Sequence, residues 1–410
     1  MSRAHTRIDE DLSGVPLELD FTKPWIEGLP QVERAPDLFT PPMIQQIVAN
    51  AVVTGASDVT LQTDRQPRIE VHGRLYRVGA RPFNRAEING FLDWIYAPNA
   101  SAQITGRQVL DFAWEMRFDR TWRQRFRVNA TGILAGKDDG VEITLRVLPR
   151  VTPSIASVSL DPALVEPMLP NEGIVIVAGA TGHGKSTTLA ALTRHLLEDR
   201  EKPRKIVDLQ KPIEYTFYDV IFGNSDGSPS LLGQSEVGRH IESFGQGVWT
   251  ALRRKPHVII VGEARDIETI EAAIEASLTG HLVHTTTHAG SVSETLRRIT
   301  QAFPAQEREG RAFDLISSLR FVVAQYLLPT ADRRGRTPIR EYLRFDADVR
   351  NALAERHPDE WPKMIAAYMR SDDPNVLKEP MWLAARKAFD KGLIDEATAR
   401  PFLVRRGRED

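Results

Sequence analysis

The sequence predicts an α/β protein in which a doubly wound α/β domain follows a smaller α+β domain. With 410 residues, the chain is longer than one compact core usually supports, so two or three domains are expected. Short strand-like runs dominate residues 57–148, whereas residues 173–345 alternate buried strands with helices. A glycine-rich motif stands between the first strand and the first helix of the second part.

The composition is that of an ordinary globular protein, with 41% hydrophobic and 26% charged residues. The absence of cysteine excludes disulfides, cysteine–zinc sites and a catalytic thiol, and it is compatible with a reducing cytosol. The net charge of −2 provides no general attraction to nucleic acid or to an anionic membrane. Neither a signal-peptide core nor a run of about 18 apolar residues occurs, so we expect no direct insertion into a membrane.

The N-terminal part is expected to divide into an arm and a small domain. Residues 1–40 mix charge with proline and show no sustained period, which predicts an extended, partly ordered arm. A helix is expected to start after Pro41 and Pro42, with Ile44, Ile47 and Val48 on one face. Residues 41–150 are predicted to form the α+β domain from the strand-like runs VTLQT, RIEVHGRLYRV, DFAWEMRF, RQRFRVNA and VEITLRVL.

The second part begins after a proline-rich stretch at 151–170, which predicts an interdomain linker. Residues 171–345 contain near-continuous apolar runs of the kind that central parallel strands need: GIVIVA, KIVDL, HVIIVG and LVHTTT. A helix is predicted at 267–278, because Asp266 can cap it, isoleucines form a stripe along it and Gly280 ends it. Residues 346–410 are charged and predict a helical C-terminal extension.

Residues 179–186, GATGHGKS, match the phosphate-loop pattern G-x-x-x-x-G-K-[ST] at every fixed position. The glycines let the backbone curl so that its N–H groups face phosphate oxygens. Lys185 adds positive charge at the β- and γ-phosphates, and the Ser186 hydroxyl ligates Mg²⁺. We therefore predict a site for ATP and Mg²⁺, with Ser186 as the metal ligand and with these nucleotide-binding residues: Gly179, Ala180, Thr181, Gly182, His183, Gly184, Lys185, Ser186 and Thr187.

Glu263 is the predicted catalytic base. The buried strand in HVIIVGEARD delivers it to the carboxyl end of the strand, where α/β sheets bind their ligands. A carboxylate at that place can orient and deprotonate the attacking water. The alternative is that Glu263 only caps the helix that begins near Asp266. Gly262 stands where a strand-end aspartate supporting Mg²⁺ would be expected.

The segment GEARDIETIEAAIEASLTGHLVHTTTHA resembles the paired Walker B and His boxes of the secretion-superfamily traffic ATPases. This superfamily includes the pilus-retraction motors (PilT), the type II and type IV secretion motors, and the DotB-type enzymes of type IVB secretion and related conjugation systems. QSEVGR, LRRKP and LRFVVAQYLL extend the similarity, and GASDVTLQ, DFAWEM and RFRVNA resemble the superfamily's small PAS-like domain. The resemblance covers roughly residues 41–345 and is greater to the DotB branch than to the pilus-retraction enzymes.

The resemblance implies a PAS-like domain joined to a RecA-like ATPase domain. It implies a homohexameric motor that powers transfer through, or assembly of, a type IVB secretion or conjugation machine, with inner-membrane components of that machine as partners. The protein would then be cytoplasmic and recruited to the inner membrane by these partners, with no nucleic acid as a direct ligand. Three alternatives remain: a pilus-retraction motor, a weakly hydrolysing nucleotide-dependent assembly scaffold, and a RecA-like helicase, which would require DNA-stimulated hydrolysis.

The resemblance also implies catalytic roles for two further residues. Glu214, in KPIEY, matches the last acid of the superfamily's Asp box, and His288 matches the His box, where it would sense the γ-phosphate. Taken alone, His288 is better interpreted as a strand-end histidine satisfied by its neighbours, and only the resemblance favours the sensor role. The first acid of the Asp box is replaced by Gln210, followed by Lys211. An amide cannot act as a base, so we expect Glu214 to carry more of the work or turnover to be slow.

Arg123, Arg125 and Arg127 alternate along one strand and therefore share a face. They could be arginine fingers that reach a neighbouring subunit's nucleotide across a ring interface. They could also form a nucleic-acid face, with Trp122 and Phe126 among them, or simply a solvated edge strand. The resemblance favours fingers, so Arg125 and Arg127, which stand in the family-like RFRVN, are predicted to be catalytic.

Overall fold

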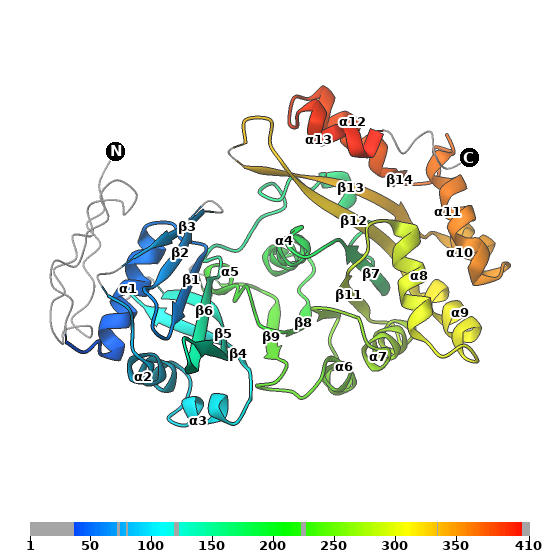
Figure 1. The fold of residues 1–410 in the computed structure, drawn as a ribbon. Coiled ribbons are helices and arrows are strands. Elements are labelled where there is room, and N and C mark those ends of the chain that lie inside the picture. Colours follow the sequence, from blue (N-terminus) through cyan, green and yellow to red (C-terminus); the bar gives the residue numbers. More distant parts are fainter. Residues whose placement is uncertain are drawn as a thin grey trace. The chain divides into compact units, whose positions relative to one another are not determined.

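The computed structural model describes residues 37–71, 74–78, 81–118, 123–222, 227–333 and 335–403. The chain forms two compact units, Met1–Arg150 and Val151–Asp410 (Figure 1). Most of the arm expected at 1–40 lies outside the described residues. The segment 151–170, expected to be a linker, belongs to the second unit, because its Leu160, Leu164 and Met168 are buried in a core of that unit.

The first unit is a six-stranded antiparallel sheet with helices, in the order β3-β2-β1-β6-β5-β4. Apolar residues of the helices and of the sheet's inward face form one core. The predicted strand runs are confirmed, as is the first helix, which begins at Pro41. The elements are α1 (Pro41–Val53), β1 (Asp58–Gln62), β2 (Arg68–Val71), β3 (Arg74–Arg77), α2 (Arg85–Ile95), α3 (Ala100–Thr105), β4 (Leu110–Arg117), β5 (Arg123–Ala135) and β6 (Asp138–Val147).

The second unit is built on an eight-stranded mixed sheet in the order β14-β13-β12-β7-β11-β10-β8-β9. The strands from β12 to β9 are parallel, whereas β13 and β14 each run antiparallel to their neighbour. The four apolar runs expected to be central parallel strands are confirmed as β7, β8, β10 and β11. The strands are β7 (Gly173–Ala178), β8 (Lys205–Gln210), β9 (Leu231–Glu236), β10 (Val258–Val261), β11 (Leu282–Thr287), β12 (Leu319–Pro329), β13 (Arg336–Arg344) and β14 (Lys378–Glu379).

Helices cover both faces of this sheet (Figure 1). Strand β7 is therefore buried along its whole length, and its alternate side chains point to opposite faces of the sheet. Ile174 and Ile176 enter the core on the side of α6 to α11, and Val175 and Val177 enter the core beneath α4. The predicted helix at 267–278 is confirmed as α7. The helices are η2 (Pro162–Leu164), α4 (Lys185–Glu198), α5 (Tyr218–Ile221), α6 (Phe244–Leu252), α7 (Ile267–Leu278), α8 (Val292–Ala302), α9 (Arg308–Ser318), α10 (Ala347–Ala354), η3 (Pro358–Glu360), α11 (Trp361–Arg370), α12 (Met381–Asp390) and α13 (Glu396–Leu403).

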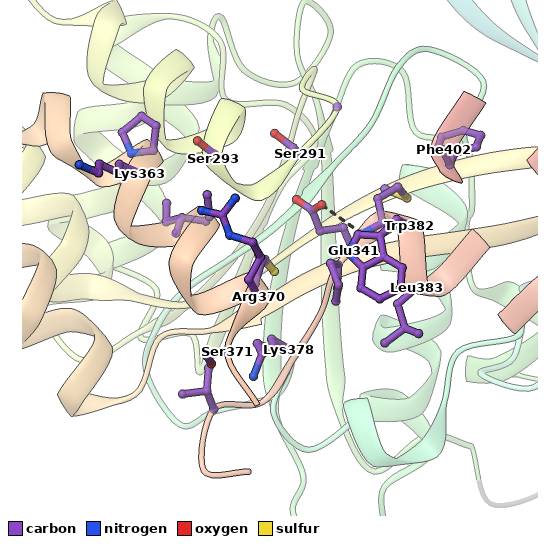
Figure 2. Close-up of a pocket in the computed structure, with 18 of the residues that line it drawn as sticks. Ser291, Ser293, Glu341, Lys363, Arg370, Ser371, Lys378, Trp382, Leu383 and Phe402 are labelled. Carbon is purple, nitrogen blue, oxygen red and sulfur yellow. Dashed lines mark hydrogen bonds between the residues drawn. The ribbon is translucent and has the colours of Figure 1, made fainter. Parts of the chain in front are cut away.

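The C-terminal segment is helical as expected, but it is part of the second unit and not a separate appendage. It supplies β14 at the sheet edge, and its Val349, Leu353 and Trp361 are buried in the main core. A cavity of about 1070 Å³ lies among α8, β12, β13 and the C-terminal helices (Figure 2). In this cavity the Glu341 carboxylate accepts hydrogen bonds from the backbone N–H groups of Val292 (2.8 Å) and Met381 (3.2 Å), at the starts of α8 and α12. Glu341 therefore ties the starts of α8 and α12 to strand β13.

Candidate functional site

The glycine-rich loop connects β7 to α4 at the carboxyl edge of the parallel strands. Gly179, Gly182 and Gly184 have φ values of 154°, 78° and 78°, a region that residues with a side chain rarely adopt. A Cβ atom on Gly179 would also lie only 2.6 Å from the backbone oxygen of Gln325. The curled backbone therefore requires glycine for both its torsion angles and its close contact with β12.

The Lys185 side chain folds back across this loop. Its Nζ donates hydrogen bonds to the carbonyl oxygens of Gly179 (2.8 Å) and Ala180 (3.1 Å), and the residue is only 9% exposed. Burial lowers the pKa of Lys185, while the nearby charges of Glu263 and Glu214 raise it. The ammonium group thus lies among loop carbonyls and within electrostatic reach of two predicted catalytic acids.

Four of the predicted residues converge at this edge. Lys185 follows β7, Glu214 follows β8, Glu263 follows β10 and His288 follows β11. These strands are parallel, so their carboxyl ends meet at the same edge of the sheet. His288 Nε2 lies 3.1 Å from one carboxylate oxygen of Glu263, and the Arg265 guanidinium lies 3.7 Å from the other. The arrangement brings a carboxylate, an imidazole and a cation together at the edge that carries the phosphate loop.

Glu263 is held in place by its neighbours along the backbone. The Thr286 hydroxyl donates to the carbonyl oxygen of Gly262 (2.6 Å), and the backbone N–H of Ala264 donates to the carbonyl of Thr286 (3.0 Å). Both peptides that flank Glu263 are therefore tied to β11. The capping alternative for Glu263 is wrong, because the side chain of Asp266 accepts the hydrogen bond from Thr269 N–H at the start of α7.

His288 has the electrostatic setting of a neutral imidazole. Burial and the charge of Lys185 lower its pKa, and the Glu263 carboxylate opposes this by raising it. Its side chain is 36% exposed, so it is accessible from the site and not enclosed within the strand end. A neutral imidazole can donate or accept a hydrogen bond, which suits contact with a phosphate oxygen or a water molecule.

The residues around Ser186 suit a magnesium ion. Ser186, Asp208 and Glu214 line one small cavity with Gln210, and hydroxyl and carboxylate oxygens are the ligands that Mg²⁺ prefers. The described residues contain no preformed cluster of three or more acidic or histidine ligands. Mg²⁺ in nucleotide sites is held by one or two protein groups together with substrate phosphates, so the donor set fits this mode of binding.

Asp208 is a buried acid of the site that motif reasoning missed. It is 2% exposed, and burial raises its pKa to about 6, opposed by hydrogen bonds from Gln210 and Gln234. The amide nitrogens of these residues lie 2.6 and 2.8 Å from its two oxygens. Gln210, which replaces an acid of the Asp box, thus serves as a donor to an acid. The signal available in the sequence was an aspartate inside the apolar run KIVDL.

The predicted arginine fingers lie on β5 in the first unit. Their shared face is confirmed, since residues 123, 125 and 127 are exposed or half-buried and alternate with buried neighbours. Arg123 pairs with Glu115 and Arg127 pairs with Asp111, both at 2.9 Å. Phe126 is buried and stacks on Trp114, so it is not available for stacking on a base, and Trp122 lies outside the described residues. The finger role of Arg125 and Arg127 stays a prediction.

The other loop and helix-end residues have local structural contacts. His281 Nδ1 lies 3.0 Å from the carbonyl oxygen of Ala276 at the end of α7. The His183 ring packs on Tyr326 with a centroid distance of 5.1 Å. The Tyr215 hydroxyl donates to Thr187 Oγ1 (3.2 Å).

In the part of the chain that the structure describes, none of the helices has the length and apolar character that a membrane span requires.

Comparisons with known proteins agree with this geometry. The family model for "Type II/IV secretion system protein" matches residues 33–361. The uncharacterized protein YggR of Escherichia coli K12 is 32% identical over 323 residues, which cover 78% of this chain and 92% of YggR. The structure of the Legionella pneumophila ATPase DotB matches with a TM-score of 0.77 and 38% identity, covering 91% of this chain and 98% of DotB. The pilus retraction motor PilT with bound ADP matches with a TM-score of 0.74 and 27% identity, covering 88% of this chain and 96% of PilT.

Replacing Gln210 by glutamate tests the contact with Asp208. Gln210→Glu would restore an acid at the first position of the Asp box, but the new carboxylate would face the buried Asp208. Two such carboxylates cannot both ionise, so at pH 8 we expect a loss of on the order of 1–3 kcal/mol in unfolding free energy. Thermal denaturation from pH 5 to 8 measures it. The loss should shrink as the pH falls from 8 towards about 6, because the variant's pair takes up its shared proton at a pH above the wild-type pKa of Asp208, which is about 6.

The matched control is Asp208→Asn combined with Gln210→Glu, which exchanges the acid and the amide. The pair again has one donor and one acceptor, so most of the lost stability should return at pH 8. A single Gln210→Glu variant as stable as wild type at pH 8 would contradict the contact.

Proposed function

The chain belongs to the Type II/IV secretion system protein family and is one of its traffic ATPases, and from this premise we propose that it is the ATP-hydrolysing motor of a type IVB secretion or conjugation machine. We assign the first unit as PAS-like and the second as RecA-like. The chain works as a homohexamer in the cytoplasm, recruited to the inner membrane by components of the machine. The observation that carries the proposal is the Glu263–His288 pair beside Lys185 at the carboxyl edge of the sheet.

Nucleotide binding in this proposal uses the phosphate loop and the N-terminus of α4. The loop N–H groups and the helix dipole bind the phosphates, as helix N-termini favour anions. Lys185 exchanges the carbonyl oxygens of Gly179 and Ala180 for phosphate oxygens, which offers the ammonium group stronger, charged acceptors. The structure of PilT with bound ADP, which shares the fold, supports a nucleotide at the equivalent place.

Hydrolysis is assigned to the residues that face the loop. Glu263 orients the attacking water and accepts its proton, because the backbone that carries it is fixed by two peptides tied to β11. His288 contacts Glu263 and can report the loss of the γ-phosphate through that contact. Ser186, with Glu214 nearby, holds Mg²⁺, which neutralises charge on the β- and γ-phosphate oxygens when bound. Two carboxylates line this cavity, that of Glu214 and that of Asp208.

The type of machine is inferred from the comparisons. The match to DotB of Legionella pneumophila has higher identity than the match to PilT, 38% against 27%, and this supports the type IVB assignment. Pilus retraction is the second candidate, since the TM-scores differ little, 0.77 against 0.74. In the host, a Glu263→Gln allele should abolish secretion or conjugative transfer and leave twitching intact. Loss of twitching with normal transfer would reject the type IVB assignment in favour of pilus retraction.

In the purified protein, Glu263→Gln should bind ATP as wild type does and lose most hydrolysis. The amide keeps the shape of the side chain and removes the base, and a general base contributes about 10²–10⁴-fold. Phosphate release and calorimetric titration with ATP measure the two effects. Lys185→Ala is the matched control, because it should abolish binding while the circular dichroism spectrum stays unchanged. A Glu263→Gln variant with more than about a tenth of the wild-type rate would place the base elsewhere.

The arginine strand predicts that activity depends on assembly. If Arg125 reaches a neighbouring subunit's nucleotide, hydrolysis per subunit should rise with protein concentration. Arg125→Ala subunits should also inactivate wild-type subunits in mixed rings, since a finger supplied in trans contributes about 10³–10⁵-fold in GTPases. The measurement is the rate of ATP hydrolysis in mixtures of wild-type and Arg125→Ala protein at a series of ratios. Light scattering follows the mass of the rings in each mixture. A loss of activity strictly proportional to the variant fraction, in intact rings, would leave this strand as surface charge.

A further inference from the structure

We propose that Gln325 and Arg340 are positioning residues that hold the phosphate loop in its anion-binding conformation. This inference rests on the proposed function and adds to it two side chains to which the sequence assigned no role: Gln325, within the family-like LRFVVAQYLL, and Arg340, which lies outside the motifs. Gln325 orients the peptide between His183 and Gly184, and Arg340 fixes the orientation of Gln325.

Gln325 is a polar residue in the middle of the apolar strand β12, and it is only 2% exposed. Its Nε2 donates a hydrogen bond to the carbonyl oxygen of His183 (2.6 Å). Its Oε1 accepts hydrogen bonds from Thr188 Oγ1 on α4 (3.0 Å) and from Arg340 Nε on β13 (2.7 Å). One amide group therefore connects the loop, the helix that follows it and the neighbouring strand.

The bond to His183 sets the direction of a loop N–H group. In a planar trans peptide the C=O and N–H groups point in opposite directions. Because Gln325 holds the His183 carbonyl toward β12, the N–H of Gly184 must point to the opposite side of the loop. The N–H groups of such a loop are the donors that bind nucleotide phosphates. Gln325 thus selects the peptide orientation that presents this donor.

Gln325 also touches both ends of the loop. A Cβ atom on Gly179 would lie 2.6 Å from its backbone oxygen, and one on Gly184 would lie 3.0 Å from its Nε2. Both distances are shorter than ordinary van der Waals contact, so this residue serves as a template against which the loop is shaped. A larger or differently oriented side chain at 325 would displace the loop itself.

Arg340 decides which way the Gln325 amide points. Oε1 receives two donors, Arg340 Nε and the Thr188 hydroxyl, so a flipped amide would place N–H groups against the guanidinium. The amide nitrogen must therefore face the loop. The other two guanidinium nitrogens of Arg340 donate to the carbonyl oxygens of Ser159 and Val158, both at 2.7 Å. The guanidinium group is thus fixed by three hydrogen bonds.

Arg340 is also an unusual buried charge. It is 8% exposed, and burial lowers its pKa to about 10, so it stays charged at neutral pH. Within the described part of the chain it forms no ion pair with a carboxylate, and its partners are carbonyl oxygens. A buried cation without a counter-ion is costly, and an anion bound at the adjoining loop would lower that cost. Its charge therefore favours the bound state of the loop.

The test compares ADP binding by calorimetry in full-length variants. Gln325→Met is neutral and of similar length, and it loses the donor to His183. We expect its ADP affinity to fall at least about tenfold, which corresponds to roughly 1.4 kcal/mol. In steady-state hydrolysis, KM for ATP should rise more than kcat falls. Thr188→Val is the matched control: it removes a donor to the same Oε1 but leaves the His183 contact, so its ADP affinity should stay within about threefold of wild type.

A second variant keeps the test decisive if Gln325→Met does not fold. Gln325→Glu retains the acceptors for Thr188 and Arg340 and gains an ion pair, so its melting temperature should not fall, while its ADP affinity should. Wild-type ADP affinity in whichever Gln325 variant folds would overturn the proposal, as would an equal loss in Thr188→Val. Failure of the wild-type protein itself to bind ADP would instead overturn the proposed function.

Discussion

The packing of the phosphate loop against strand β12 is the contact on which the rest of the site depends. The loop has no regular hydrogen-bonded structure, so its peptide orientations are set by what it touches. On one side Lys185 bonds to two of its carbonyls, and on the other Gln325 holds a third. With three carbonyls tied down, the N–H groups of the corresponding peptides are directed away from these contacts. The loop is thus organised before any phosphate arrives, which reduces the ordering cost of binding.

The parallel strands then place the chemistry relative to that loop. Glu214, Glu263 and His288 are each delivered by a different strand, and they meet only because β8, β10 and β11 run in the same direction as β7. The charges of Glu214 and Glu263 raise the pKa of Lys185, and burial at the sheet edge lowers the pKa of His288. A site assembled in this way tolerates changes in one strand end when a neighbouring side chain compensates. The Asp208–Gln210 pair illustrates this, since the acid absent at 210 is found two residues earlier on the same strand.

The motif-bearing part of the molecule could be predicted from the sequence because its signals are local. Glycine torsions define the loop, and Asp266 and Gly280 mark α7 at both ends, so that helix was predicted to the residue. The antiparallel strands β13 and β14 could not be predicted, because their pairing is decided by tertiary contacts and leaves no period of its own. The same holds for Gln325 and Asp208. Each looks like an ordinary polar interruption of an apolar run until its partners are known. The sequence therefore identifies the residues proposed to contact the nucleotide better than the residues that hold them in place.

The buried charges explain why so many polar contacts surround one loop. Lys185 and Arg340 have lowered pKa values and Asp208 has a raised one, and in each case burial is the largest cause. Each group therefore lies where its charged form is disfavoured, which lowers the stability of the protein without nucleotide. For the two cations, a bound polyphosphate would supply additional negative charge. The unfavourable burial of these two cations is relieved only when nucleotide is bound. It therefore contributes to the difference in free energy between the nucleotide-free state and the bound state. A motor needs such a difference, because nucleotide can drive a conformational change only by stabilising one state more than the other.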